Sequence, residues 1–214
     1  SYFHLEPGSK VLDLMCGYGR HSIGLARKGV KVTAVDNLAA YIDEINRTVL
    51  EENLPVTTIH QNILDFETDE QYDLAICMGN SLNFFNAGDV KKIFSIVSNC
   101  LKPGGQLLIN SWSLAEIVFR TFKESGSSTI GDMQFTVQSA ISFQPTRMET
   151  ESTITTAEGK TEEKKAVDYI YSINEIEAML SSVGLVLKEV FSIPGRKKFS
   201  IGEPRAYLVA RKAN

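Results

Sequence analysis

The feature that most constrains the fold of this chain is a short apolar run that leads directly into a glycine-rich turn. The run spans residues 11–14, the turn contains Gly17 and Gly19, and a helical pattern begins at about Gly19. Glycine allows a sharp turn and leaves no Cβ between the backbone and a ligand. The free N–H groups at the start of the helix point at the same space. This order predicts a ligand site at the carboxyl end of the first strand of an open α/β sheet.

Strand-like and helical patterns alternate along the first half of the chain. Apolar or β-branched runs occupy residues 11–14, 32–35, 57–60, 74–77 and 106–109. Because these runs are continuously apolar, they suit strands that are covered on both faces of a parallel sheet. The clearest helical pattern is a stripe of apolar residues on one face: Val90, Ile93, Phe94, Val97 and Leu101. Residues 102–105 (KPGG) are expected to end this helix.

The pattern changes in the second half. Residues 128–171 contain three extended runs separated by turns at 144–146 and 157–160, which predicts an inserted antiparallel β meander. A helix around Ile176 and Met179 and two strands, 185–191 and 205–211, follow. The whole chain, residues 1–214, is therefore predicted to be one α/β domain with a doubly wound, seven-stranded, mostly parallel sheet.

Composition excludes several classes of protein. The chain has 214 residues, 22 Lys and Arg against 26 Asp and Glu, and a net charge of −4, so it has no general attraction to nucleic acid or to anionic lipid. No apolar run approaches the roughly 18 residues of a membrane helix, and the first residues carry no signal pattern. Cys16, Cys77 and Cys100 form no CxxC pair, so we predict reduced cysteines, no metal site and a cytoplasmic protein.

Two further features narrow the ligand. Asp36 ends the second strand, 17 residues after Gly19, where a carboxylate accepts hydrogen bonds from ribose hydroxyls in nucleoside-binding α/β folds. The third glycine of the dinucleotide fingerprint is absent, because Ser22 stands in its place. The turn therefore predicts a site for a nucleoside without a diphosphate.

At these residues the chain resembles the Rossmann-like S-adenosylmethionine (SAM)-dependent methyltransferases. The resemblance covers about residues 10–109 and the closing helix–strand–strand segment. It is carried by LDLxCGxG at 12–19, VTAVD at 32–36, YDL at 72–74 and LKPGG at 101–105. The helix start GRHS at 19–22 is similar to members that act on small molecules.

The resemblance implies a set of cofactor-binding residues for SAM and for its product S-adenosylhomocysteine. Asp13, Gly17 and Gly19 are expected at the methionine end, and Asp36 at the ribose. Asn62 stands where many members have an aspartate that contacts the adenine amino group. The full predicted set is Asp13, Cys16, Gly17, Tyr18, Gly19, Asp36, Asn37, Leu38, Asn62, Ile63, Met78 and Gly79.

The family reaction is an in-line displacement at the sulfonium methyl group. It needs mainly alignment in a dry pocket, and a base only where the nucleophile must lose a proton. No catalytic pair is evident, and the candidates for a catalytic group are Tyr18, His21 and Asn80. The residues expected to face the methyl acceptor are Asn80, Asn83, Phe84, Trp112 and Arg205. For each of them, local packing or hydrogen bonding is the alternative role.

Two features that the sequence lacks favour a small-molecule methyl acceptor. The Asn/Asp-Pro-Pro-Tyr/Phe motif is replaced by MGNS at 78–81, and no basic, aromatic-interleaved face is visible. Residues 128–171 occupy the position of a substrate-covering insertion, so we expect a lid or a dimer contact in a monomer or homodimer. Three alternatives stay open at this point: methylation of RNA or protein, a non-catalytic SAM-binding module, and a nicotinamide dehydrogenase.

Family members commonly carry a helical segment before the first strand that closes over the site. Only nine residues precede Lys10 in this chain. The sequence therefore predicts either that this segment is missing from the chain or that the site is open.

Overall fold

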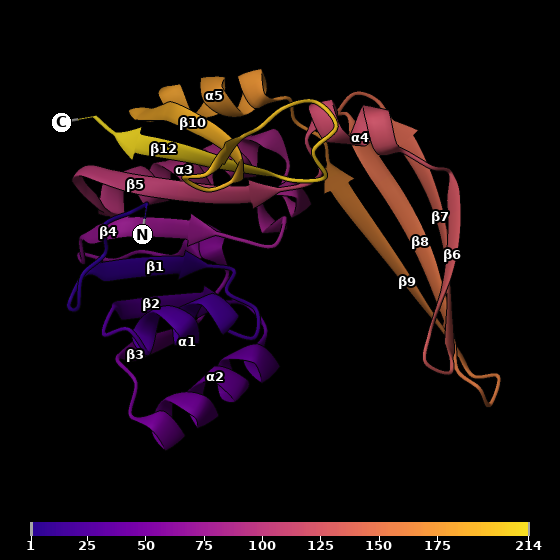
Figure 1. The fold of residues 1–214 in the computed structure, drawn as a ribbon, viewed down its shortest axis with the longest axis horizontal. Helices are drawn as coiled ribbons and strands as arrows, with labels where there is room; N and C mark the ends of the chain where they lie inside the picture. The colour runs from indigo at the N-terminus through magenta and orange to yellow at the C-terminus, as the bar shows by residue number, and fades with distance from the viewer. Residues whose placement is uncertain (1, 214) are drawn as a thin grey trace.

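The strands form two separate sheets in the computed structural model, which describes residues 2–213 (Figure 1). The main sheet has the order β11-β10-β12-β5-β4-β1-β2-β3. Its strands are β1 (Lys10–Leu14), β2 (Lys31–Asp36), β3 (Val56–His60), β4 (Tyr72–Cys77), β5 (Leu101–Ser111), β10 (Leu185–Ile193), β11 (Lys197–Lys198) and β12 (Ala206–Lys212). Strands β1 to β5 pair in parallel, whereas β12, β10 and β11 pair antiparallel. The predicted doubly wound sheet is confirmed, and the two-residue edge strand β11 is added to its seven strands.

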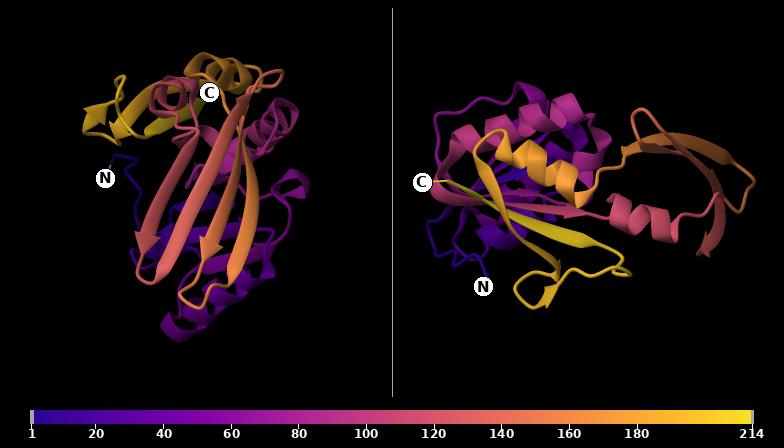
Figure 2. Two further views of the ribbon diagram at one scale, coloured as in Figure 1. Left: turned by 90° about the vertical axis from the view of Figure 1, so that its right-hand side faces the viewer. Right: turned by 90° about the horizontal axis from the view of Figure 1, so that it is seen from above.

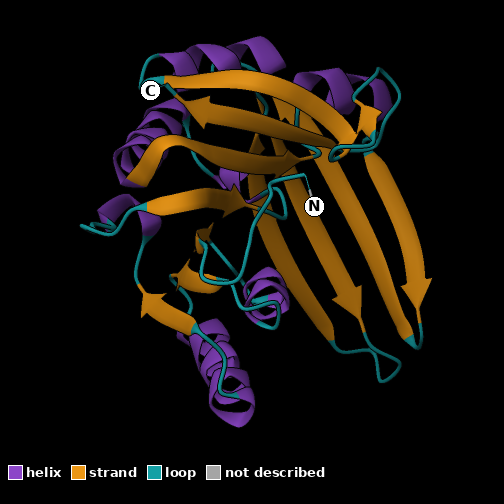
Figure 3. Cartoon of the chain, turned by 60° about the vertical axis from the view of Figure 1, so that its left-hand side comes forward, coloured by secondary structure: helices purple, strands orange, loops and turns teal. Residues whose placement is uncertain are grey.

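Helices cover both faces of the main sheet (Figures 2 and 3). They are α1 (Arg20–Ala26), α2 (Ala39–Glu52), α3 (Ala87–Cys100), α4 (Ala115–Thr121) and α5 (Ile173–Ser181), with short 3₁₀ turns η1 (Ile63–Asp65) and η2 (Ser81–Phe84). Strand β1 sends Val11 into the core under α1 and Leu12 into the core under α3 and α5. Burial on both faces explains why this strand is continuously apolar. None of the helices within residues 2–213 is long and apolar enough to cross a membrane.

The junction between α3 and β5 differs from the sequence prediction. The stripe from Val90 to Val97 is buried on α3 as expected, but the helix ends at Cys100, and Leu101 already belongs to β5. Leu101 pairs with Tyr72, and the next pair joins Gln106 to Leu74. Residues 102–105 therefore bulge out of the strand pairing rather than forming the end of the helix.

The second sheet is an antiparallel meander, here called the arm, that extends from the main sheet between α4 and α5 (Figure 1). Its strands are β6 (Ser125–Ile130), β7 (Met133–Ser142), β8 (Arg147–Thr155) and β9 (Thr161–Tyr169). The predicted bounds, 128–171, and the predicted three strands were not accurate. Strand β6 was missed because its six residues are all exposed and carry no apolar alternation. Tyr171 lies outside the arm, in an isolated bridge with Leu114.

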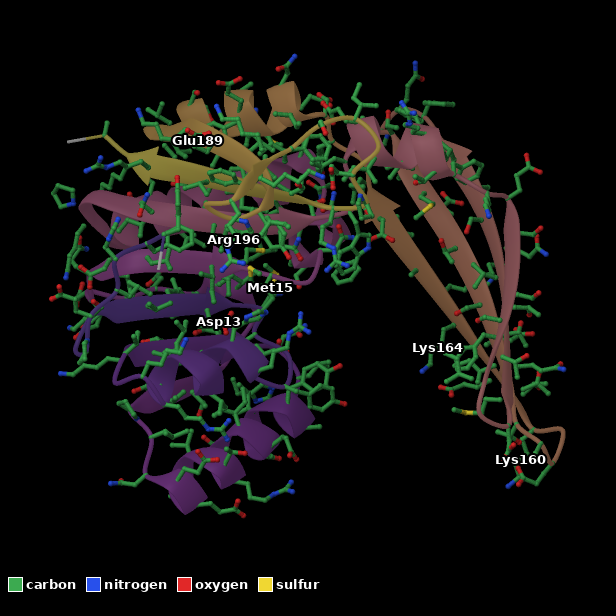
Figure 4. The ribbon with its side chains drawn as sticks, in the orientation of Figure 1. Asp13, Met15, Lys160, Lys164, Glu189 and Arg196 are labelled. Atoms are coloured by element: carbon green, nitrogen blue, oxygen red, sulfur yellow. The ribbon has the colours of Figure 1, made fainter. Side chains whose placement is uncertain are left out.

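The two faces of the arm differ in polarity. Residues that lie directly opposite on paired strands share a face, and one face carries Phe135, Val137 and Ile141 of β7 with Ile154 and Met148 of β8. The other face carries Glu149, Glu151 and Lys165. Lys164 lies on the apolar face, opposite Ser152, and Figure 4 shows it pointing from β9 toward the side of the main sheet. The apolar face is therefore the inner face of the arm.

Candidate functional site

Two adjoining cavities open at the carboxyl edge of β1, β2 and β4. The first has a volume of about 480 Å³ and extends from Asp36 and Leu38 to Phe84. The second has a volume of about 290 Å³ and reaches Asp13 and Met78. Met15, Gly17 and Ser81 line both cavities, so the two form one continuous depression. Figure 4 shows Asp13 and Met15 near the end of β1.

The predicted cofactor-binding residues come together around this depression, with the exception of Gly19. The first cavity is lined by Gly17, Asp36, Asn37, Leu38, Asn62 and Ile63. The second is lined by Asp13, Cys16, Gly17, Tyr18, Met78 and Gly79. The cavities are also lined by residues outside the predicted cofactor-binding and acceptor-facing sets: Met15, Arg20, Val35, Tyr41, Gln61, Ser81 and Phe85.

The two glycines of the turn have different roles. Both have positive φ, +55° at Gly17 and +70° at Gly19. A Cβ on Gly17 would meet no atom within 4 Å, so this residue leaves open space beside the cavities. A Cβ on Gly19 would lie 2.5 Å from Cγ1 of Ile45 on α2. Gly19 therefore serves the packing of α1 against α2, whereas Gly17 keeps the backbone accessible to a ligand.

The carboxylate of Asp36 joins the loops that follow β1 and β2. Its Oδ2 accepts a hydrogen bond from the Gly17 backbone N–H at 2.9 Å, and its Oδ1 accepts one from the Leu38 N–H at 3.0 Å. The side chain is 7% exposed and lines the first cavity. Each carboxylate oxygen has a second acceptor position, so the group can hold the loops and still accept hydrogen bonds from a ligand.

Asp13 is buried below the second cavity. Its Oδ2 accepts a hydrogen bond of 2.6 Å from the Ser22 hydroxyl on α1. Burial raises the pKa of Asp13 to about 7, and the Ser22 hydrogen bond opposes this rise. This carboxyl group therefore titrates near neutral pH.

Aromatic and imidazole side chains form the outer rim. Tyr18 is 68% exposed and packs against Tyr41, with ring centroids 4.2 Å apart. His21 accepts a hydrogen bond from Arg20 Nε at 3.2 Å, and burial together with Arg20 lowers the pKa of His21, which favours the neutral imidazole. No cluster of three or more metal-ligand side chains occurs within residues 2–213.

Asn80 and Asn83 are buried behind the wall of the cavities and do not project into them. Asn80 is 2% exposed, and its Oδ1 accepts hydrogen bonds from the backbone N–H groups of Trp112 and Ser113 at 2.9 and 3.0 Å. Asn83 is 1% exposed and donates to the backbone oxygens of Ser113 and Tyr169 at 3.2 and 2.8 Å. The expected contact with an acceptor is not supported by this geometry, because both amides are used to join η2, β5 and the arm.

The other three residues that were predicted to face the methyl acceptor are exposed at the same edge of the sheet. Phe84 lines the first cavity, and Trp112 follows the last residue of β5. Arg205 was predicted to begin the last strand, but it precedes the first residue of β12. Because Ala206 pairs with Ser111 in an antiparallel register, Arg205 comes opposite Trp112. Sequence reasoning missed Asp168 at the end of β9, whose Oδ1 accepts a hydrogen bond of 3.1 Å from Asn80 Nδ2.

Comparisons with known proteins agree with this architecture. Residues 11–105 match the family model described as a methyltransferase domain. The putative methyltransferase YqeM of Bacillus subtilis is 32% identical over 118 residues, which cover 53% of this chain and 47% of that protein. The chain thus matches less than half of the length of this curated relative.

Solved structures share the fold over nearly the whole chain. An S-adenosylmethionine-dependent methyltransferase from Clostridium acetobutylicum has a TM-score of 0.83 at 21% identity, covering 96% of this chain and 85% of that chain. The SAM-bound amino pentose methyltransferase CalS10 from Micromonospora echinaspora has a TM-score of 0.72 at 18% identity, covering 96% and 84%. Residues 11–105 thus match a methyltransferase-domain model, and the chain shares its fold with solved S-adenosylmethionine-dependent methyltransferases, in agreement with the motifs.

We predict that Gly19→Ala destabilises the protein more than Gly17→Ala. Both changes place an alanine at positive φ, which costs about 1–2 kcal/mol, but only the Gly19 Cβ collides with Ile45. Urea denaturation of the two variants measures the difference in the free energy of unfolding. In an Ile45→Ala background the collision is removed, so the difference should shrink. Equal losses for the two glycine variants would contradict this packing role.

A second prediction concerns pH. The folded-state pKa of Asp13, about 7, lies above the ordinary value of 3.8, so the folded protein binds more protons than the unfolded chain between these pH values. The contribution of Asp13 to stability therefore falls as the pH rises from about 4 to 7. Asp13→Asn, which can still accept from Ser22, should remove this slope in urea titrations from pH 4.5 to 8, and exposed Asp43→Asn should leave it. If the difference in the free energy of unfolding between the wild type and Asp13→Asn is the same at every pH, the raised pKa is not that of Asp13.

Proposed function

We propose that this protein is a SAM-dependent methyltransferase that moves the sulfonium methyl group to a nitrogen or oxygen of a small-molecule acceptor and releases S-adenosylhomocysteine. The observation that carries the proposal is the pair of cavities that meet at Gly17, with the Asp36 carboxylate in the wall of the first. The open space at Gly17 suits a ligand that runs from one cavity into the other.

The first cavity suits an adenosine group. Asp36 keeps acceptor positions for the two ribose hydroxyls while it holds the Gly17 and Leu38 N–H groups. Leu38 and Ile63 supply apolar surface for the base. Asn62 Oδ1 already accepts from the Leu64 N–H at 3.0 Å, so its Nδ2 is the group that we assign to the adenine ring.

The second cavity suits the methionine part. Asp13, Met78 and Gly79 line it beside the glycine turn, and Tyr18 and His21 border its opening. SAM, when bound, supplies a methyl group on a positively charged sulfur that leaves as a neutral thioether. The rim tyrosines offer ring faces that attract a cation. Holding the donor and the acceptor in line can contribute about 7–11 kcal/mol to lowering the barrier.

The acceptor side is formed by the exposed end of β5, η2 and the inner face of the arm. Trp112 and Phe84, 46% and 57% exposed, offer aromatic surface next to the cavities. The structural relative CalS10 is described as an amino pentose methyltransferase, which supports an acceptor of the size of a sugar. The role of the arm as a lid or dimer contact, the monomeric or homodimeric state and the cytoplasmic location stay predictions.

We predict that Asp36→Ala weakens binding of SAM and of S-adenosylhomocysteine at least tenfold in titration calorimetry, because the ribose hydroxyls lose their acceptor. Asp43→Ala on the exposed side of α2 is the matched control and should bind as the wild type does. An unchanged affinity in Asp36→Ala would refute the ribose contact. No heat with either ligand for the wild-type protein would refute the proposed function.

We also predict that label from methyl-tritiated SAM enters low-molecular-weight compounds when the protein is incubated with a fractionated metabolite extract. Transfer RNA and peptide mixtures are the parallel samples. Label found only in RNA or protein contradicts a small-molecule acceptor. Binding of S-adenosylhomocysteine without transfer to any sample instead indicates a non-catalytic module.

A further inference from the structure

Asp168 brings a carboxylate from the arm to Asn80, in the segment that follows β4. It lies one residue before the end of β9, opposite Met148 of β8, and on the inner face of the arm with Lys164. The residues that pair near it on this face, Ile141 and Met148, are apolar. A carboxylate next to these two apolar side chains calls for a chemical explanation.

The carboxylate is held by a side chain that cannot move freely. Asn80 Nδ2 donates to Asp168 Oδ1 at 3.1 Å and to the Ser113 hydroxyl at 2.8 Å. The Oδ1 atom of the same amide accepts hydrogen bonds from the backbone N–H groups of Trp112 and Ser113. Its chain neighbours on both sides, Gly79 and Ser81, line the second cavity. Asn80 thus holds Asp168 one hydrogen bond away from a segment that lines the second cavity, and close to the end of β5.

The charge of Asp168 has no cationic partner in the part of the chain that the structure describes. No lysine, arginine or histidine side chain within residues 2–213 lies at ion-pair distance from it, and Asn80 is a neutral donor. Lys164, on the same face, pairs with Glu162 at 3.2 Å and stands four residues along the strand, about 13 Å away. Burial raises the pKa of Asp168, and the Asn80 hydrogen bond opposes this rise. The site therefore offers an anchored anion that a cationic N–H donor would complement.

We propose that Asp168 binds the nitrogen of the methyl acceptor and that the acceptor is a primary or secondary amine. This inference rests on the proposed methyltransferase function and names its substrate class. The carboxylate receives the ammonium form by a charge-assisted hydrogen bond. Asn80 is the positioning residue that holds the carboxylate in place.

The reaction balances with these groups. The ammonium transfers one proton to Asp168, which leaves a neutral amine with a free electron pair. That pair forms the new nitrogen–carbon bond as the carbon–sulfur bond breaks, and the sulfur keeps the electrons of the broken bond. The product is a methylated ammonium and a thioether, and Asp168 returns its proton to water. A raised carboxyl pKa favours this proton transfer.

The test uses two analogues of S-adenosylhomocysteine in which nitrogen replaces sulfur. One carries a 2-aminoethyl arm on that nitrogen, and the other carries a propyl arm of the same length. Titration calorimetry on the whole chain should show that the wild-type protein binds the aminoethyl analogue at least tenfold more tightly. Asp168→Asn, which can still accept from Asn80, should bind the two analogues equally. Glu162→Gln, on the same face of β9, is the matched control and should keep the preference.

The other outcomes are equally decisive. Equal affinities in the wild type, or a preference that persists in Asp168→Asn, overturn the inference. A loss of SAM affinity without a loss of S-adenosylhomocysteine affinity in Asp168→Asn places the carboxylate at the sulfonium and also overturns it. If wild-type protein fails to bind S-adenosylhomocysteine, the proposed function fails first. Met148→Lys supplies a competing ammonium opposite Asp168 and should abolish the preference even if Asp168→Asn does not fold.

Discussion

Strand β1 lies between β2 and β4, and its burial on both faces decides where the following loop runs. Val11, Leu12 and Leu14 are fully buried, and burying each such side chain stabilises the fold by about 1.5–3 kcal/mol. With this strand held, the glycine turn leaves the sheet at the edge where the parallel strands β2 and β4 also end. The Asp36 carboxylate and the loop after β4 therefore meet the turn, and the two cavities form between them.

Buried polar groups hold this edge together because each has a partner. A buried polar group without one costs about 1–3 kcal/mol, so groups such as Asp36 and Asn80 specify the arrangement of the loops that they join. Asn80 bonds to Ser113 and Asp168, which are 33 and 88 residues away in the chain. One amide thus couples the end of β4 to the end of β5 and to the arm. The position of the arm over the edge depends on this coupling together with the Asn83 contacts.

Much of the site was predictable because its residues are close in sequence to strand ends. Asp13 lies near the end of an apolar run, and Gly17 and Asp36 follow such runs; parallel strands bring these positions to one edge. The packing role of Gly19 was not predictable, since it depends on Ile45 of another helix. Asn80 also follows a strand, but only the return of β9 shows that its amide is enclosed. Asp168 carried no local signal, because its importance comes from a partner far away in the chain.

The sequence by itself determined the parallel sheet, the edge at which the site lies and the residues of the glycine turn, since local patterns of apolar residues and glycines are sufficient for these. Only the tertiary structure decided that Asn80 and Asn83 join the arm to the sheet, that β6 completes the arm, and that Asp168 bonds to Asn80. The physical reason is that hydrogen bonds between distant segments, and an exposed edge strand held by backbone pairing, leave no periodic pattern in the sequence.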